Sequence, residues 1–298
     1  MHALIALALL YLLRASPALA HGSEPHESYV VWTFDPWIVV PLFVAGLLYA
    51  VGSWKLWRRA RSGPAQFRRA AFYGAGWLSL AAALVSPLHW LGEHLFTFHM
   101  IEHEIVMAIS APLMVAARPV AALLWGLPRR IRRVFGNAMR TDLARTAWNC
   151  ASGGAMATFL HALAIWAWHA PALFDAAVEN VALHRLQHLS FFLTAVLFWW
   201  SVLWRSDRGV AAWHLFITML HTGVLGALMA LAPRVLYVMQ TRTAQDWGLT
   251  PLEDQQLAGL MMWVPAGTIY AGAALAMAAR WIATASRGAE NVQRLRSS

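Results

Sequence analysis

The histidines with the most informative spacing form two His-x-x-x-His pairs, His99/His103 and His184/His188, each at the start of a long apolar segment. On a helix, residues four apart lie on one face, with Cβ atoms about 5–6 Å apart. A pair can chelate one metal ion, and two pairs on facing helices can share a site. Ionisable residues in apolar helices are costly and usually have a partner or a function. The pairs predict a metal site with His99, His103 and His188 as its main ligands.

Further residues could complete or support this site. Imidazole combined with a methionine thioether favours copper, and the thioether favours Cu(I) in particular. Zinc more often takes cysteine or carboxylate beside histidine, and nearby carboxylates keep zinc possible. Carboxylates can also orient imidazoles through their second nitrogen atoms. The candidate additional ligands are His184, His169 and Met100, and the candidate orienting carboxylates are Glu102, Asp175 and Asp254.

Other interpretations of the histidines remain open at this point. Two histidines at matching depth on different helices, such as His103 and His188, can ligate a haem axially. Single histidines beside tryptophan at a membrane surface can be amphipathic anchors, which accounts for His89, His94 and His169 as well as ligation does. The deeper His161 and His221 favour hydrogen-bonded contacts between helices.

The composition indicates an integral membrane protein. Of the 298 residues, 59% are hydrophobic and 12% charged, with 17 tryptophans, and apolar runs of bilayer-spanning length recur. The net charge of +9 does not indicate nucleic-acid binding, because the arginines lie in short loops between apolar runs. The single cysteine, Cys150, excludes an intrachain disulfide and a CxxC metal motif; we expect it to be a buried packing residue.

The order of segments predicts an all-α, polytopic membrane helical bundle with seven transmembrane helices after a cleavable signal peptide. Residues 1–20 form the signal, ending in an A-x-A site, residues 21–35 an extracytoplasmic tail, residues 36–282 the transmembrane domain and residues 283–298 a cytoplasmic tail. If the signal is cleaved, His21 offers a terminal amine and an imidazole for Cu(II), although a flexible polar tail is the simpler interpretation. The seven apolar spans, each long enough to cross the hydrocarbon, are Pro36–Trp57, Ala70–Leu91, Phe96–Ala117, Thr146–Trp168, Leu183–Trp204, Ala211–Ala232 and Leu257–Ile282.

Arginines predict the orientation of these spans. They concentrate after the first, third, fifth and seventh spans, which by the positive-inside rule puts the mature N-terminus outside and the C-terminus in the cytoplasm. The histidine pairs then lie at the outer face. The long basic loop contains Ile131, Val134, Phe135 and Met139 at helical spacing, which fits either an interfacial helix or a solvated loop. Thr250-Pro251-Leu252-Glu253 fits a capping box that opens the last helix.

Four runs together are similar to the multi-span CtaG-type assembly factors of caa-type cytochrome c oxidase. They are His99-Met100-Ile101-Glu102-His103 leading into Ala111-Pro112-Leu113, Trp168-His169-Ala170-Pro171-Ala172-Leu173-Phe174-Asp175, Leu183-His184-Arg185-Leu186-Gln187-His188-Leu189-Ser190, and Asp254-Gln255-Gln256-Leu257-Ala258-Gly259 followed by Met262-Trp263-Val264-Pro265. The resemblance covers the second to the seventh span. It implies a role in supplying or inserting copper into oxidase subunits, and it makes His99, His103, His169, His184, His188 and Asp254 candidate functional positions. The family pattern admits Gln as well as Glu at position 102.

The sequence thus predicts a non-enzymatic copper-binding assembly factor of a bacterial inner membrane. Its copper would exchange with cytochrome c oxidase subunits or a periplasmic copper chaperone. A copper transporter or resistance permease is the competing class, but transport needs ligands through the whole membrane, and the candidate ligands thin out in the inner half. A scaffold that binds no metal is a third possibility. No nucleophile–base pair, phosphate loop or cofactor fingerprint argues for an enzyme.

Overall fold

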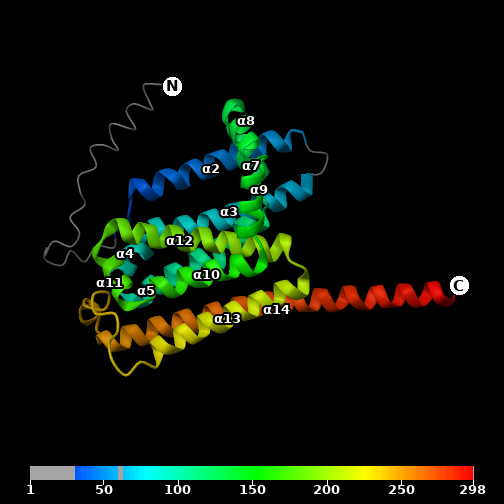
Figure 1. The fold of residues 1–298 in the computed structure, drawn as a ribbon. Helices are drawn as coiled ribbons and strands as arrows, with labels where there is room; N and C mark the ends of the chain where they lie inside the picture. Colours follow the sequence, from blue (N-terminus) through cyan, green and yellow to red (C-terminus); the bar gives the residue numbers. More distant parts are fainter. Residues whose placement is uncertain (1–30, 60–62, 298) are drawn as a thin grey trace.

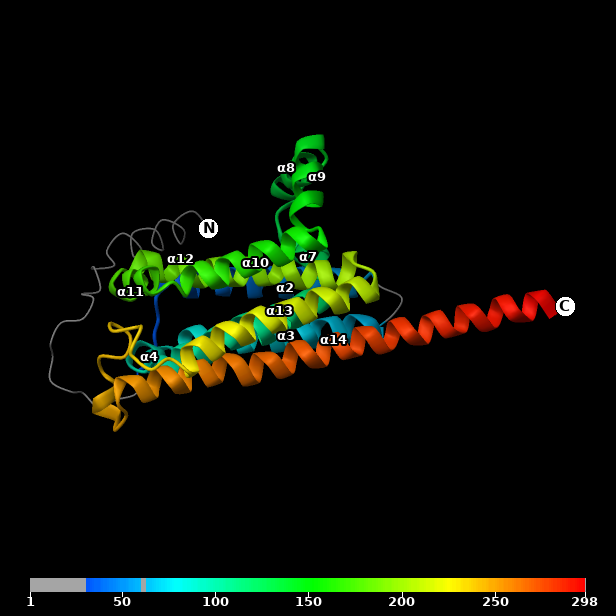
Figure 2. The same ribbon diagram turned by 60° about the horizontal axis from the view of Figure 1, so that its bottom comes forward.

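The computed structural model describes residues 31–59 and 63–297, and in this part of the chain regular structure is entirely helical. The long helices run alongside one another, and the short helices α8 and α9 project from the bundle (Figure 1; Figure 2). The predicted signal peptide, His21 and most of the predicted N-terminal tail lie outside the described residues.

Five helical segments are long and apolar enough to cross a membrane, and two bent pairs bring the number to seven if each pair is one span. The predicted membrane helical fold is therefore confirmed, with its count of seven resting on the bent pairs. The unbent segments are α2 (Pro36–Trp57), α5 (Phe96–Glu104) with η1 (Ile105–Ser110) and α6 (Ala111–Ala116), α12 (Val181–Trp200) with η2 (Ser201–Arg205), α13 (Arg208–Ala230), and α14 (Pro251–Ser297).

The first bent pair is α3 (Gly63–Val85) and α4 (Pro87–His94), which meet at 45°. Ser86 accepts a hydrogen bond from the Leu88 amide (3.2 Å), and Pro87 occupies the first helical position. Serine caps and first-turn prolines both start new helices. The chain therefore begins a second helix here rather than continuing the predicted single span Ala70–Leu91.

The second bent pair corrects the predicted span Thr146–Trp168. Its first residues belong to α9 (Asp142–Ala151), which meets α10 (Gly154–Trp168) at 68°. The backbone of Gly153, between the two helices, is extended, so the chain leaves the α-helical conformation there. Cys150, expected to be buried, is exposed on α9 because this helix lies outside the packed bundle (Figure 2).

The remaining elements are short, apart from the end of α14. The basic loop is helical, with α7 (Val120–Gly126) leading to α8 (Arg129–Ala138), and α8 exposes Ile131, Val134 and Phe135 as an interfacial helix would. α11 (Pro171–Glu179) precedes α12, and η3 (Ala244–Trp247) precedes α14. The predicted capping box is confirmed by reciprocal bonds between Thr250 and Glu253. α14 continues beyond Ile282, through the predicted tail.

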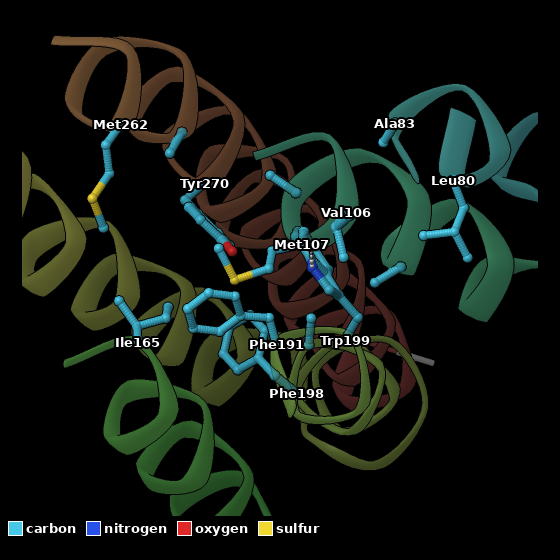
Figure 3. Packing of buried hydrophobic residues seen from close by; sticks show 14 of the residues in the cluster. Leu80, Ala83, Val106, Met107, Ile165, Phe191, Phe198, Trp199, Met262 and Tyr270 are labelled. Carbon is cyan, nitrogen blue, oxygen red and sulfur yellow. Dashed lines mark hydrogen bonds between the residues drawn. The ribbon is translucent and has the colours of Figure 1, made fainter. Parts of the chain in front are cut away.

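A π-helical segment, η1, interrupts the helix that carries His99 and His103, and α12 stabilises it. In the π register the carbonyl of Met107 would accept from residue 112, but Pro112 has no N–H. The indole N–H of Trp199 donates to this carbonyl instead (3.0 Å; Figure 3), and that of Trp204 donates to the carbonyl of Val115 (3.0 Å). Each such bond contributes about 1 kcal/mol. Together they fix α5–η1–α6 against the helix that carries His184 and His188.

Candidate metal centre

Three buried histidines from two helices come together at the end of the bundle opposite the arginine-rich loops. His99 and His103 lie on α5 and His188 on α12, and one nitrogen atom from each lies within 4.8 Å of the others. Their ring centroids are 4.3 Å apart for His99–His103 and 4.9 Å for His103–His188. Their exposed fractions are 1%, 1% and 7%. The two pairs predicted from spacing do meet.

The nitrogen atoms of this group, which we call the histidine triad, are short of hydrogen bonds. Among the described residues, Nε2 of His99, both nitrogen atoms of His103 and Nδ1 of His188 are buried without a hydrogen-bond partner. Buried polar atoms in proteins are nearly always paired, so each exception calls for an explanation. Neutral imidazole nitrogen is a common ligand for copper and zinc. The donor set of the histidine triad therefore fits a metal ion.

His184 lies between the histidine triad and the surface. Its Nε2 atom is 2.9 Å from Nε2 of His188, with the two rings nearly parallel. One of these nitrogen atoms must donate and the other accept. His184 is only partly buried, and its ring centroid is 5.4 Å from that of His99. It can therefore contact an ion on the way to or from the buried ligands.

His169, directly after α10, approaches the histidine triad from a third element. Its ring centroid is 6.2 Å from that of His103. A carbonyl only accepts, so the 2.7 Å contact with the carbonyl of Ile165 means that Nδ1 of His169 donates. Nε2 then carries the lone pair, and it has no partner. Burial lowers the pKa of His169 to about 4, which keeps the ring neutral at pH 7, as a metal ligand must be.

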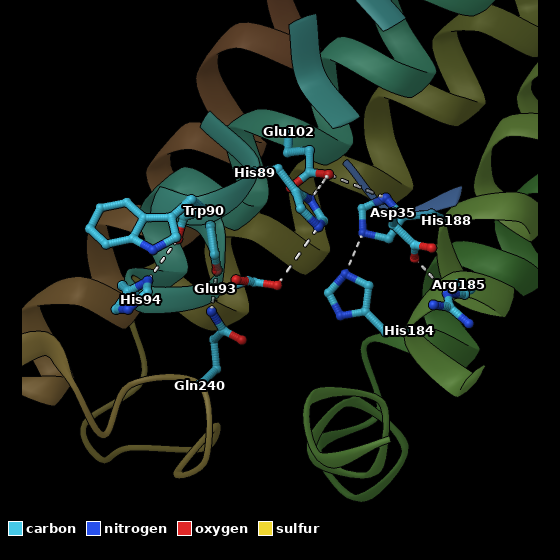
Figure 4. A network of polar contacts seen from close by, with 11 residues as sticks. Asp35, His89, Trp90, Glu93, His94, Glu102, His184, Arg185, His188 and Gln240 are labelled. Atoms are coloured by element: carbon cyan, nitrogen blue, oxygen red, sulfur yellow. Dashed lines mark hydrogen bonds and ion pairs between the residues drawn. The ribbon is translucent and has the colours of Figure 1, made fainter. Parts of the chain in front are cut away.

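Glu102 is a buried carboxylate that lies beside two histidines, His89 and His188. It is fully buried, and its Oε1 atom lies 2.8 Å from Nδ1 of His89 and 3.7 Å from Nδ1 of His188 (Figure 4). Glu102, predicted to orient an imidazole of the site, has its hydrogen bond with His89 rather than with a member of the histidine triad. Carboxylates in this position fix which nitrogen atom of a histidine is protonated.

His89, for which the sequence left ligation and surface anchoring open, lies beside the histidine triad. It lies on α4, is 5% exposed, and its ring centroid is 6.0 Å from that of His188. α4 can come this close because residue 92 is glycine: a Cβ atom there would lie 3.1 Å from Oε2 of Glu102 and 3.3 Å from the Cα of His99. The cue in the sequence was the helix start at Pro87, which separates His89 from the preceding span.

Asp254, predicted to orient an imidazole, instead caps α5. Its Oδ2 atom accepts from the Phe96 amide (2.8 Å), and its Oδ1 atom accepts from the amide (3.0 Å) and hydroxyl (2.7 Å) of Thr97. Leu95, at the N-cap position, has no side-chain oxygen to do this. A residue at the start of α14 therefore holds the start of the helix that carries His99 and His103.

We expect Asp254→Ala to lower the thermal unfolding temperature of the detergent-solubilised protein measurably. The change leaves the first amides of α5 without their acceptor and should cost about 1–3 kcal/mol. Asp254→Asn, which keeps one acceptor oxygen, should lose less. Asp246→Ala, which changes an exposed aspartate on η3, is the matched control. Equal unfolding temperatures for Asp254→Ala and Asp246→Ala would contradict the capping role.

The structure places the other candidates around rather than within the histidine triad. Met100 is fully buried in the apolar core beside His99. Asp175 lies on α11, its Oδ1 atom is buried without a hydrogen-bond partner among the described residues, and burial raises the pKa of its carboxyl. Outside the cluster, His94 contacts the carbonyl of Trp90 (2.7 Å).

The deeper histidines make contacts between helices, as expected. Nδ1 of His161 lies 3.2 Å from the Thr194 hydroxyl, and its Nε2 lies 3.5 Å from the Tyr270 hydroxyl. The indole of Trp166 donates to Nδ1 of His221 (3.4 Å). These contacts join α10 to α12, α13 and α14, and they pair both nitrogen atoms of His161.

The comparison with protein families gives one assignment. The model of the cytochrome c oxidase caa3 assembly factors (Caa3_CtaG) matches residues 47–284, well over half of the chain. Neither the comparison with curated proteins nor that with solved structures found a significant match. The matched range includes every histidine of the cluster and the helices that carry them. This chain therefore belongs to the family of cytochrome c oxidase caa3 assembly factors.

Proposed function

We propose that this protein holds one copper ion between His99, His103 and His188 and hands it to cytochrome c oxidase during assembly. The observation that carries the proposal is the convergence of three buried imidazoles with unpaired nitrogen atoms. Copper is the metal we propose because the donors are imidazoles beside a methionine, which suits Cu(I), and because the resemblance implies copper supply. The role is non-enzymatic: binding, retention and release.

The residues around the histidine triad support retention of the copper ion in a single site. His169 and Met100 are neighbours able to add a fourth ligand, while Glu102 and His89 hold the rings in place. The ligands are neutral, so no uncompensated charge stays buried when the ion leaves, and the rings of Phe174 and Phe191 pack against His99 and His103. His184, partly exposed and in contact with His188, gives a ligand at which an oxidase subunit or a periplasmic copper chaperone can take over the ion.

Two alternative functions are less compatible with this geometry. A haem ligated by His103 and His188 would need a porphyrin between the rings, but their centroids are only 4.9 Å apart. A transporter needs ligand groups through the membrane. Within the described residues, the triad is the single group of three clustered ligand side chains, and His161 is bonded to other helices.

The proposed location is the outer face of a bacterial inner membrane. The arginine-rich loops lie at the end of the bundle opposite the histidine triad (Figure 1). By the positive-inside rule, that end is cytoplasmic. The triad would then face the periplasm, where a copper site of an oxidase subunit can be loaded.

Metal analysis of the purified protein tests the proposal. We expect about one copper per chain after loading with Cu(I) and desalting, and almost none in His99→Ala plus His103→Ala, since two of three ligands are lost. His94→Ala, which changes a histidine outside the cluster, is the control and should retain copper. His99→Gln plus His103→Gln repeats the test with more of the side-chain volume kept.

Equal copper content in the wild type and both double variants would refute the copper site. A Soret band with stoichiometric haem would replace the proposal with a membrane cytochrome. Copper uptake into sealed vesicles would favour transport over handover.

A further inference from the structure

A separate feature of the molecule lies away from the histidine triad, between α2 and α3. Only 11% of the most apolar window of α2 is buried, so this helix packs loosely on the bundle. It is held mainly on α7, where a Cβ at Gly52 would collide with the carbonyl oxygen of Ala122, so only glycine allows this close approach. Along α3 it is held by the Trp77 indole, which donates to the carbonyl of Leu42 (2.9 Å).

Beside these contacts the two helices leave a groove of about 580 Å³. Its lining is almost entirely apolar. Small residues, among them Gly46, Ala50 and Gly74, leave the space, and the aromatic residues Tyr49, Tyr73 and Trp54 form walls. Tyr49 and Tyr73 are stacked with ring centroids 3.5 Å apart. An open apolar groove on the lipid-facing side of a membrane helix suits a hydrocarbon chain.

Within the described residues, no carboxylate forms an ion pair with Arg58 or Arg69 at the arginine-rich end of the groove. From residue 36 to residue 92 the sequence contains five arginines and one lysine but no aspartate or glutamate. The guanidinium of Arg58 lies 5.1 Å from the ring centroid of Trp54, which lines the groove. Arg69 directly precedes Ala70, another lining residue. A basic pocket between transmembrane helices is a recurrent binding site for anionic lipid headgroups.

We propose that the groove between α2 and α3 is a specific site for an anionic phospholipid. One acyl chain occupies the apolar groove, and the phosphate lies at its arginine-rich end near Arg58 and Arg69. Attraction between the arginines and the phosphate makes the site selective. A zwitterionic lipid can fill the groove but gains little binding free energy from the arginines. The site is independent of copper, because none of its residues belongs to the histidine cluster.

Native mass spectrometry of the full chain in detergent, titrated with phosphatidylglycerol or phosphatidylcholine, tests this. We expect the wild type to retain one phosphatidylglycerol in preference to phosphatidylcholine. Arg58→Gln plus Arg69→Gln should weaken phosphatidylglycerol binding about tenfold or more, as expected for two lost charges near the headgroup. Arg130→Gln plus Arg140→Gln removes the same charge from exposed positions on and after α8 and should bind as the wild type does.

A second variant tests the groove itself. Ala50→Trp fills the space and leaves every arginine in place, so it should lose the retained lipid while keeping its copper content. Equal retention of the two lipids by the wild type, or unchanged phosphatidylglycerol retention in Ala50→Trp or in the groove arginine variant, would overturn the proposal. A protein retained in the groove instead of a lipid would overturn it as well.

Discussion

Replacing His188 with alanine is expected to weaken Cu(I) binding by more than about 100-fold. Loss of a group that merely supports a ligand typically costs about 10- to 100-fold in metal affinity. His188 is one of the three ligands proposed here, and it is the one that α12 contributes to the two from α5. Without it, His99 and His103 remain as a pair on one helix. Competition with a colorimetric Cu(I) chelator measures the change.

His94→Ala is the matched control for this experiment. His94 lies on α4 at the same end of the bundle, but its recorded hydrogen bond is to the carbonyl of Trp90. It should bind copper with wild-type affinity. Thermal unfolding of the copper-free proteins shows whether His188→Ala is folded. A folded His188→Ala protein with wild-type affinity would contradict the assignment of His188 as a ligand.

Glu102→Ala is expected to affect both stability and metal binding. The change leaves Nδ1 of His89 buried without its 2.8 Å partner, which should lower the free energy of unfolding by about 1–3 kcal/mol. It also removes the carboxylate beside His188, so copper affinity should fall about 10- to 100-fold. Chemical unfolding in detergent and chelator competition give the two values.

Two further variants separate charge from hydrogen bonding. Glu102→Gln keeps an acceptor for His89 and should lose less stability than Glu102→Ala. Glu93→Ala removes a partly exposed carboxylate that lies 3.8 Å from Nε2 of His89, and it should behave almost as the wild type. If Glu102→Ala matched Glu93→Ala in copper affinity, Glu102 would have no part in positioning the site.

Local sequence features, such as helix caps and the length of apolar runs, predicted much of the fold. α2 begins and ends at the predicted residues Pro36 and Trp57, because its apolar run is bounded by Asp35, which caps it, and by Arg58. The bends were not predicted. Hydropathy averages over about twenty residues, so it does not register a serine–proline helix start inside an apolar run, nor the Ser152-Gly153 break between α9 and α10.

The pairing of His99 with His103 was also predictable from their spacing of four, and matched depth made His188 a candidate third ligand. Contacts between distant segments were not. Asp254 binds residues 157 and 158 positions earlier in the chain, and Trp199 bonds the carbonyl of Met107, 92 positions away. Both depend on which helices are neighbours. The role of His89 stayed open for the same reason, because a single histidine on a short helix has no periodic partner.

X-ray absorption at the copper edge of the Cu(I)-loaded protein tests the central claim most directly. We expect about three nitrogen atoms in the first coordination shell, with the multiple scattering of imidazole rings, and a weaker imidazole contribution in His188→Ala. A first shell dominated by sulfur, or by oxygen without imidazole scattering, would contradict it.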